Sequence, residues 1–200
     1  MENFYITIGR QFGSGGREIG KKVAEALGVP YYDKELLAVA AKESGLSHQF
    51  LQEYDEKPNN SFLYSLVMGQ SGLIGGHSGP TVEQMAANAQ RDAVLAVAKK
   101  GSCVIVGRCA DYILRDEPGL LRVFISADYD ARVKHICQRD GVTEKEAEEK
   151  IKKMDKSRAA HYSFQTDKKW GAVESYDLCI NSSKRGFDAA VRLILDFVKA

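Results

Sequence analysis

A run of glycines and arginines close to the amino terminus has the composition of a phosphate-binding loop. Residues 9–20 read GRQFGSGGREIG and stand between a short apolar segment and residues with helical spacing. Glycines let a backbone take positive φ angles and approach an anion closely, and free amides at a helix start favour phosphate. Arg10 and Arg17 add positive charge that pairs with phosphate oxygens. A plain turn needs less glycine and arginine than this, so we favour a phosphate loop.

Two known loop patterns compete for this segment. The dinucleotide-binding pattern G-x-G-x-x-G begins at Gly13, but its third glycine falls on Glu18. Asp33, at the end of the second expected strand, would suit a contact with a ribose. A Rossmann-type dinucleotide-binding oxidoreductase is therefore one alternative.

The second pattern is the kinase loop G-x-x-x-x-G-K-[ST], whose lysine reaches the nucleotide phosphates. Arg10, Gly13 and Gly15 fall on its frame when the following helix is aligned. Gly16 then stands where the lysine belongs, Arg17 follows it, and the next residue, a glutamate, takes the hydroxyl position. This pattern favours a divergent kinase loop that carries arginine in place of lysine.

A sheet is needed to position these residues. Short apolar segments rich in β-branched residues alternate with segments of helical spacing, which predicts an α/β fold with a parallel sheet between two layers of helices. The expected strands are residues 4–8, 29–32, 103–106, 121–125 and 178–181. Ligands bind at the carboxyl ends of such strands, so the loops after Ile8, Tyr32 and Val106 should share one rim.

Two helix starts carry capping-box spacing, a pattern that satisfies the first backbone amides of a helix. Thr81 and Gln84 precede a long helix with an apolar face, and Thr143 and Glu146 precede a highly charged helix that runs to about residue 160. Residues 44–80 between the first helices are the least regular part of the chain.

Composition excludes several classes of protein. The 200 residues carry 28 Lys and Arg against 27 Asp and Glu, a net charge of +1, which excludes the basic footprint of a nucleic-acid binder. No apolar stretch approaches the roughly 18 residues of a membrane span, and no secretory signal is visible. Four scattered cysteines indicate reduced thiols in a cytoplasmic protein.

The sequence assigns no oligomeric state. The dispersed histidines are interpreted as surface or packing residues, and His161 is the one to test.

Residues 6–20 (ITIGRQFGSGGREIG) together with residues 27–34 (LGVPYYDK) resemble the cytidylate kinase-like family, a divergent branch of the P-loop nucleoside monophosphate kinases. The resemblance covers nearly the whole chain and is also strong at Gly107-Arg108. It implies one P-loop NTPase-type domain over residues 1–200, a three-layer fold around a five-stranded parallel sheet. A helical insertion for the nucleoside monophosphate, at about residues 44–100, and a lid, at about 140–170, belong to that expectation. The implied activity is transfer of the ATP γ-phosphate to CMP or dCMP, with Mg²⁺.

The resemblance also assigns roles at the glycine loop. It implies that backbone amides hold the ATP phosphates and that Arg17 substitutes for the missing lysine. The candidate cofactor-binding residues are Arg10, Gly13, Ser14, Gly15, Gly16, Arg17 and Glu18. Asp33 matches the acidic residue that ends the second strand in cytidylate kinases, where it would bind Mg²⁺ or help position the acceptor phosphate. Glu18 is the other candidate Mg²⁺ ligand, and a helix cap is the plain alternative for Asp33.

On the acceptor side, Gly107-Arg108 matches the Gly-Arg-Asp motif of cytidylate kinases, so Arg108 is expected to face the acceptor phosphate. The aspartate of that motif, which helps hold the acceptor nucleoside, is Cys109 here. Asp111, two residues further on, is the substrate-binding candidate in its place. A further acceptor arginine of the family is Val39 here.

The expected lid carries Asp155 and Arg158, which match the Asp-x-x-Arg of the cytidylate kinase lid and share one helix face. A solvated helix with a local ion pair is the plain alternative. The resemblance implies that Arg158 stabilises transferred charge, with Asp155 catalytic and substrate-binding beside it, and Arg132 and Arg139 are further candidates. The catalytic set is then Arg17, Arg108, Asp155 and Arg158.

Phosphoryl transfer relies on positioning and charge neutralisation rather than on a Ser-His-Asp set, and the sequence offers arginines for that purpose. The predicted function is therefore a nucleoside monophosphate kinase that acts on small-molecule nucleotides. A degenerate family member that binds a nucleotide for regulation, without turnover, is the main alternative, and the missing loop lysine supports it.

Overall fold

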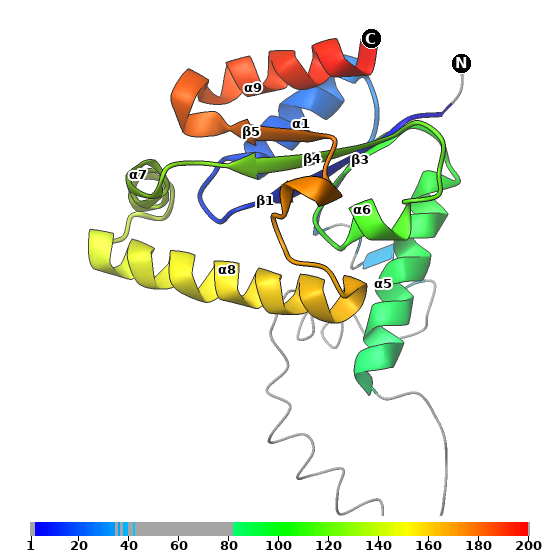
Figure 1. The fold of residues 1–200 in the computed structure, drawn as a ribbon, viewed down its shortest axis with the longest axis horizontal. Coiled ribbons are helices and arrows are strands. Elements are labelled where there is room, and N and C mark those ends of the chain that lie inside the picture. The colour runs from blue at the N-terminus through cyan, green and yellow to red at the C-terminus, as the bar shows by residue number, and fades with distance from the viewer. Residues whose placement is uncertain (1–2, 35, 37, 40–41, 43–81, 200) are drawn as a thin grey trace, which may run out of the picture.

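The architecture is a five-stranded parallel sheet with helices on both faces (Figure 1). A computed structural model describes residues 3–34, 36, 38–39, 42 and 82–199, and the account below concerns those residues. The strands are β1 (Tyr5–Arg10), β2 (Tyr31–Tyr32), β3 (Cys103–Val106), β4 (Leu120–Ser126) and β5 (Leu178–Asn181). Their order is β2-β3-β1-β4-β5, and every neighbouring pair is parallel. The predicted fold class is confirmed.

The strand order decides between the two loop patterns. β3 lies between β1 and β2, so that Val104 pairs with Ile6 on one side and with Tyr31 on the other. In the dinucleotide-binding order 3-2-1-4-5-6, β2 adjoins β1 directly. The Rossmann-type oxidoreductase alternative is therefore wrong, which agrees with the mismatch of its third glycine at Glu18.

Two helices cover one face of the sheet, α1 (Gly16–Leu27) and α9 (Ser182–Lys199). They lie together above the strands in Figure 1. Ile19 of α1 and Ile194 of α9 are buried in one cluster with Ile6 and Ile8 of β1. Alternate residues of β1 face this layer, as the pleat of a strand requires, and the packing fixes where the loop between β1 and α1 must turn.

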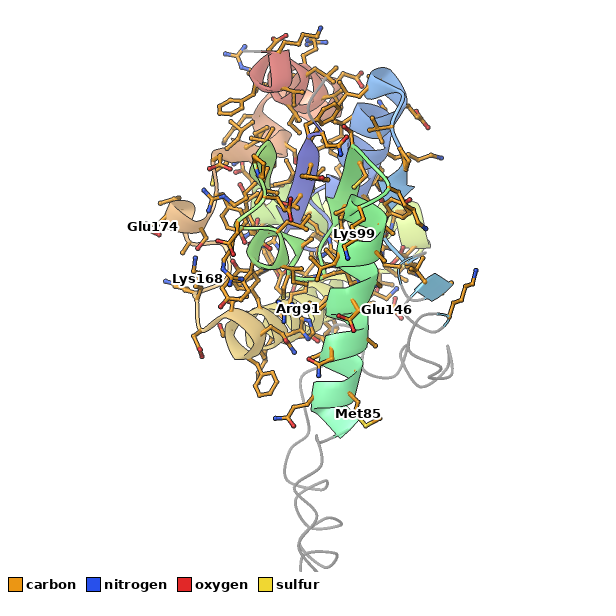
Figure 2. The ribbon with its side chains drawn as sticks, turned by 90° about the vertical axis from the view of Figure 1, so that its right-hand side faces the viewer. Met85, Arg91, Lys99, Glu146, Lys168 and Glu174 are labelled. Atoms are coloured by element: carbon orange, nitrogen blue, oxygen red, sulfur yellow. The ribbon has the colours of Figure 1, made fainter. Side chains whose placement is uncertain are left out.

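The opposite face carries α5 (Val82–Ala98) and the short α6 (Ala110–Ile113). A second buried cluster joins α5 to the strands and includes Ala93, Val97 and Ile105. Figure 2 shows α5 along its length, with Met85 near its beginning and Lys99 just beyond its end. The start predicted from Thr81 and the irregular residues 44–80 lie outside the described residues.

Helices α7 (Tyr129–Asp140) and α8 (Glu144–Thr166) follow β4 and pack against each other. The capping box predicted for α8 is confirmed, because the Thr143 N–H donates to Glu146 Oε2 at 2.9 Å. The helix continues to Thr166, beyond the predicted end. The third buried cluster consists of Val133, Ile136, Ala147 and Ile151. A 3₁₀ turn (Val173–Ser175) then leads into β5. Among the helices described, none has the length and apolar character that crossing a bilayer requires.

Candidate active site

The loop between β1 and α1 turns through two left-handed glycines. Gly13 has a φ of 82° and Gly15 a φ of 76°, a region that residues with a β-carbon seldom adopt. Gly15 caps α1, and the first intrahelical bond of α1 runs from the Ile19 N–H to the Gly15 carbonyl at 2.9 Å. The amides just before Ile19 have no acceptor within the helix. These amides and the helix dipole form a site for an anion.

The carbonyl oxygens of the loop are held by groups of the surrounding protein. Ser14 Oγ donates to the Gln11 carbonyl at 2.9 Å, and Ser182 Oγ, at the start of α9, donates to the Ser14 carbonyl at 2.7 Å. The Gly13 carbonyl lies 2.8 Å from Nδ1 of His135, on α7, and this contact requires the proton on Nδ1. Because these carbonyl oxygens already have hydrogen-bond donors within the protein, the N–H groups of the loop are the groups that can bind a ligand.

His135 is a residue of the site that sequence reasoning missed, because it was interpreted as a surface or packing histidine. Its ring packs edge-on against Phe187, with 5.4 Å between centroids. Its Nε2 lies 3.6 Å from Oε1 of Glu18, in the first turn of α1. The spacing of α7 in the sequence places His135 on a helix but carries no information on where that helix packs, so no local signal was available.

Asp155 ties helix α8 to the glycine loop. Its Oδ1 accepts from the Phe12 N–H at 2.7 Å, and its Oδ2 accepts from Nη1 of Arg132 at 2.6 Å. The guanidinium groups of Arg139 and Arg158 lie 5.2 and 5.5 Å from the centre of the Phe12 ring, within cation–π range. The lid residues predicted from the sequence therefore contact the loop directly.

Besides Arg132, which is 7% exposed and paired with Asp155, three buried arginines concentrate positive charge around the loop: Arg10, Arg108 and Arg158 are 5 to 7% exposed. Arg158 Nη1 donates to the Arg10 carbonyl at 3.2 Å. Burial, followed by the charge of Arg10, lowers the pKa of Arg108 to about 10; Arg17 and Arg158 act in the same direction, and Asp33 acts against them. Arg108 still carries its charge at neutral pH. Guanidinium groups form charge-assisted hydrogen bonds with phosphate oxygens, so a cluster of them beside the loop suits a polyphosphate.

Arg17, the expected substitute for the lysine, is paired with Asp33. Its Nε lies 2.6 Å from Asp33 Oδ2, and its Nη2 donates to Oδ1 at 3.4 Å. The Arg17 side chain is 40% exposed, whereas that of Asp33 is 9% exposed. Asp33 ends β2 on the same rim as the loop, as predicted, and the fold brings these two site residues together.

Mg²⁺ is a hard cation that kinase sites bind through one or two carboxylates together with substrate phosphates. Within the described ranges, no group of three His, Cys, Asp or Glu side chains forms a dedicated cage. Asp33 is a buried carboxylate on the rim of the loop, so it fits the requirement for a single protein ligand. Glu18, the other predicted ligand, faces His135 instead.

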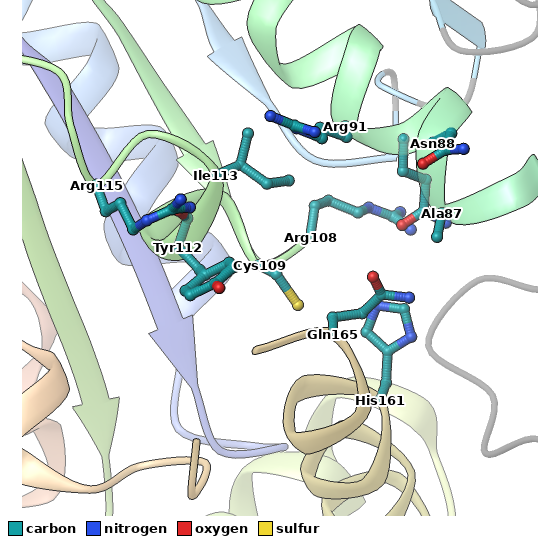
Figure 3. A pocket seen from close by; sticks show the side chains of 11 residues that line it. Ala87, Asn88, Arg91, Arg108, Cys109, Tyr112, Ile113, Arg115, His161 and Gln165 are labelled. Atoms are coloured by element: carbon teal, nitrogen blue, oxygen red, sulfur yellow. The ribbon is translucent and has the colours of Figure 1, made fainter. Parts of the chain in front are cut away.

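A cavity of about 310 Å³ opens beside Arg108 (Figure 3). Helix α5 contributes Asn88 and Arg91 to its lining, and α8 contributes His161 and Gln165. In Figure 3 the Arg108 side chain extends from the end of β3 toward Asn88, with His161 and Gln165 on the facing side. The polar lining and the volume are those of a site for a small polar molecule.

Smaller hollows connect this cavity to the glycine loop. One is lined by Arg10, Arg108, Cys109 and Arg158 among others, and another, at the loop itself, again includes Arg10 and Arg158. The candidate residues of the loop, of the end of β3 and of α8 are thereby brought to one continuous edge of the sheet.

Asp111, the candidate in place of the family's aspartate, is engaged with Tyr162. Its Oδ2 accepts from the Tyr162 hydroxyl at 2.7 Å. Burial raises the pKa of Asp111, and the hydrogen bond from Tyr162 partly offsets this; burial also raises the pKa of Tyr162. Asp111 lines the small hollow beside Arg108 and is not among the residues lining the 310 Å³ cavity. The contact connects α6 with α8, close to the backbone that carries Arg108.

Comparisons with known proteins agree with a kinase-like site. A model of the cytidylate kinase-like family matches residues 5–184. The chain is 26% identical over 199 residues to a cytidylate kinase of Pyrococcus horikoshii, covering 98% of this chain and 90% of that one. It is 22% identical to a cytidylate kinase of Methanopyrus kandleri, covering 94% and 90%.

Solved structures give the same fold. The crystal structure of an uncharacterized protein from Eubacterium ventriosum has a TM-score of 0.73 at 32% identity, with 99% of each chain covered. A shikimate kinase from Bacteroides thetaiotaomicron has a TM-score of 0.53 at 15% identity, with 98% of this chain and 99% of that one covered. The second likeness concerns the fold alone, which is that of the P-loop kinases.

Proposed function

The chain belongs to the cytidylate kinase-like family, and on that premise we propose that it transfers the γ-phosphoryl group of ATP to a nucleoside monophosphate, with CMP or dCMP as acceptor. One observation carries the proposal: a glycine loop with its carbonyls held by Ser182 and His135 stands beside three buried arginines. Amides and guanidinium groups on one rim are donors that bind the oxygens of a triphosphate.

The ATP phosphates would be held by the backbone amides of residues 13–18, at the start of α1. Charge for these phosphates would come from Arg10, Arg17 and Arg158, which line the hollow at the loop. Asp33 would hold Mg²⁺ together with phosphate oxygens, whereas Glu18, the other carboxylate predicted for this role, faces His135. Bound Mg²⁺ would neutralise charge on the phosphates.

The acceptor would occupy the cavity on the far side of Arg108. Arg108 would bind the acceptor phosphate, which sets the attacking oxygen in line with the ATP phosphates. Asp111 would act on the acceptor side, through the wall beside Arg108. The helical insertion of about residues 44–100, to which α5 belongs, would complete this side, and the lid of about 140–170 would close over the phosphates.

The chemical step needs little covalent help from the protein. The transition state of phosphoryl transfer is loose and spreads charge over the equatorial oxygens, so catalysis consists of positioning and neutralisation. Arg108 reaches the reaction centre from the acceptor side and Arg158 from α8, while Arg17 is available at the rim. In this arrangement, Asp155 is a positioning residue that keeps α8, and with it Arg158, against the loop.

Turnover tests the proposal directly. Purified protein is mixed with MgATP and each of CMP, dCMP, UMP, AMP and GMP, and ADP release is followed by a coupled assay. We expect CMP or dCMP to accelerate ADP release. We expect Arg158→Ala to lower the rate about 10²-fold or more, far beyond any loss of folded protein, which thermal unfolding measures. Arg192→Ala, an exposed position on α9, serves as the control and should behave like the parent.

The other outcomes identify the competing functions. ATP binding without acceleration by any acceptor would overturn the kinase proposal in favour of the nucleotide-binding regulator. Acceleration by a different nucleoside monophosphate would keep the phosphotransferase and remove the assignment of CMP. Failure to bind ATP at all would remove both nucleotide functions.

A further inference from the structure

An arginine and a glycine have exchanged places in the phosphate loop. In the pattern G-x-x-x-x-G-K, the position of the lysine falls on Gly16 and the second glycine on Gly15. Counting back along the same pattern, the first glycine falls on Arg10. The cation missing at the start of α1 is therefore matched by an additional cation at the end of β1.

The two exchanged residues are in contact in the fold. A β-carbon added at Gly16 would lie 2.5 Å from Cβ and 2.9 Å from Cγ of Arg10, closer than side-chain carbons approach in proteins. Gly16 is not among the glycines with a positive φ, so its backbone would accept a side chain. Glycine is needed at this position because the stem of Arg10 crosses over its α-carbon.

Arg10 is also placed where the loop cation of a kinase is needed. It is 5% exposed, although it is the last residue of the central strand β1 and lies at the carboxyl end of the sheet. It lines both the hollow at the glycine loop and the hollow beside Arg108. After burial, the nearby charge of Arg10 is the largest cause that lowers the pKa of Arg108. A cation in this position faces both phosphate-bearing substrates of the proposed reaction.

Arg17 is placed differently, although it is nearer to the lysine position in the sequence. Its guanidinium makes a two-point contact with Asp33 and is 40% exposed. To reach the phosphates, Arg17 would have to give up a buried carboxylate, whereas Arg10 already lies against the loop.

We propose that Arg10 is the catalytic cation of this loop: its guanidinium, delivered from the end of β1, contacts the terminal phosphates of ATP where other kinase loops use a lysine from the helix start. The inference rests on the proposed function and specifies it. Arg10 presents a planar fork of donors that binds two phosphate oxygens at once, whereas lysine offers a compact point charge. The exchange therefore keeps the positive charge of the loop and changes the geometry with which the loop binds the nucleotide.

Reversal of the exchange is the decisive experiment. The variants are Arg10→Gln, Arg10→Gly, Gly16→Lys and the double variant Arg10→Gly/Gly16→Lys. Arg17→Gln is the comparison at the loop, and Arg192→Gln, at an exposed position of α9, is the control. Each is measured for kcat with the best acceptor and, independently of turnover, for the Kd of a non-hydrolysable ATP analogue by calorimetry. Circular dichroism and thermal unfolding report on folding.

We expect Arg10→Gln to lower kcat by about 10²–10³-fold, the usual effect of removing one group that stabilises transition-state charge, and to weaken binding of the analogue. Arg17→Gln should lower kcat less than Arg10→Gln does, because Arg17 is 40% exposed and its guanidinium is held by Asp33. Arg192→Gln should leave kcat unchanged. Gly16→Lys alone should be impaired by the clash with Arg10. The double variant should regain at least about tenfold in kcat over Arg10→Gly, because it restores the ordinary order of glycine and lysine.

Several results would overturn the inference. Arg10→Gln with a kcat within about threefold of the parent would remove Arg10 from the reaction, as would a large loss confined to Arg17→Gln. If Arg10→Gly fails to fold, Arg10→Lys replaces it, and a kcat for that variant no better than that of Arg10→Gln would count against a cationic role. Loss of analogue binding in Arg10→Gln, in a protein that no acceptor stimulates, would uphold Arg10 and overturn the proposed kinase activity instead.

Discussion

The carboxylate of Asp155 is expected to support both the stability of the chain and the shape of the phosphate loop. Asp155→Ala removes two contacts at once, the 2.7 Å bond from the Phe12 N–H and the 2.6 Å bond from Arg132. The Arg132 side chain is 9% exposed and that of Asp155 20%, so water replaces the lost carboxylate only in part. The loop amide would lose its acceptor, and the mostly buried Arg132 guanidinium would keep only the Phe12 carbonyl, 3.4 Å from its Nη1.

The magnitude follows from these contacts. A hydrogen bond to a charged group contributes about 1.5–3 kcal/mol, and breaking a fully buried ion pair costs about 3–5 kcal/mol. The partial exposure of Asp155 sets the expected loss of unfolding free energy near the lower end of the second range, at about 3 kcal/mol. In a chain of this size that corresponds to a fall of about 6–12 °C in Tm.

Two further variants make the assay specific. Asp155→Asn keeps an oxygen for the Phe12 amide and loses only the charge, so its loss of stability in urea unfolding should be smaller. Asp188→Asn removes the partner of Lys22 from an exposed surface pair and should leave the unfolding free energy almost unchanged, because surface ion pairs contribute little. If Asp155→Ala were as stable as Asp188→Asn, and bound an ATP analogue as tightly as the parent, the coupling of α8 to the loop would be refuted.

Three further outcomes are expected. Asp33→Asn removes the buried carboxylate that fits Mg²⁺ in the described part of the chain, so the Mg²⁺ concentration that half-saturates ADP release should rise about tenfold or more; an unchanged value would place the metal elsewhere. Arg108→Ala should lower kcat about 10²-fold with little change in Tm, and near-normal turnover would remove Arg108 from the mechanism. Hydrogen bonds from Arg139, and then from Lys150, lower the pKa of Asp140 to about 2. The contribution of Asp140 to stability should therefore be present above about pH 4 and be lost as the pH falls toward 2; carboxyl NMR that shows ordinary titration would mean that these exposed pairs do not form in solution.

Local sequence patterns were sufficient for most of the fold. Alternating strands and helices predicted the parallel sheet, and the spacing of Thr143 and Glu146 predicted the start of α8, because capping is decided by neighbouring residues. The glycine loop and Asp33 could be placed on one rim for the same reason, since the carboxyl ends of parallel strands meet there.

The contacts of the site were harder to predict because they join distant parts of the chain. The pairing of Arg17 with Asp33 and of Asp111 with Tyr162 depends on how helices pack, which no spacing rule specifies. His135 was misread for the same reason. In the sequence, the exchange at Gly16 is visible only as a missing lysine.

The side chains that hydrogen-bond to the glycine loop belong to helices that are translated long after the loop itself. The loop carbonyls and the Phe12 amide are fixed by His135, Asp155 and Ser182, which lie on three different helices of the carboxyl-terminal half. A nascent chain on the ribosome therefore exposes its phosphate loop first and completes its supports last. Competence to bind nucleotide would be acquired late in synthesis, and a chain that ends before α9 would carry the whole loop without the hydroxyl that holds the Ser14 carbonyl.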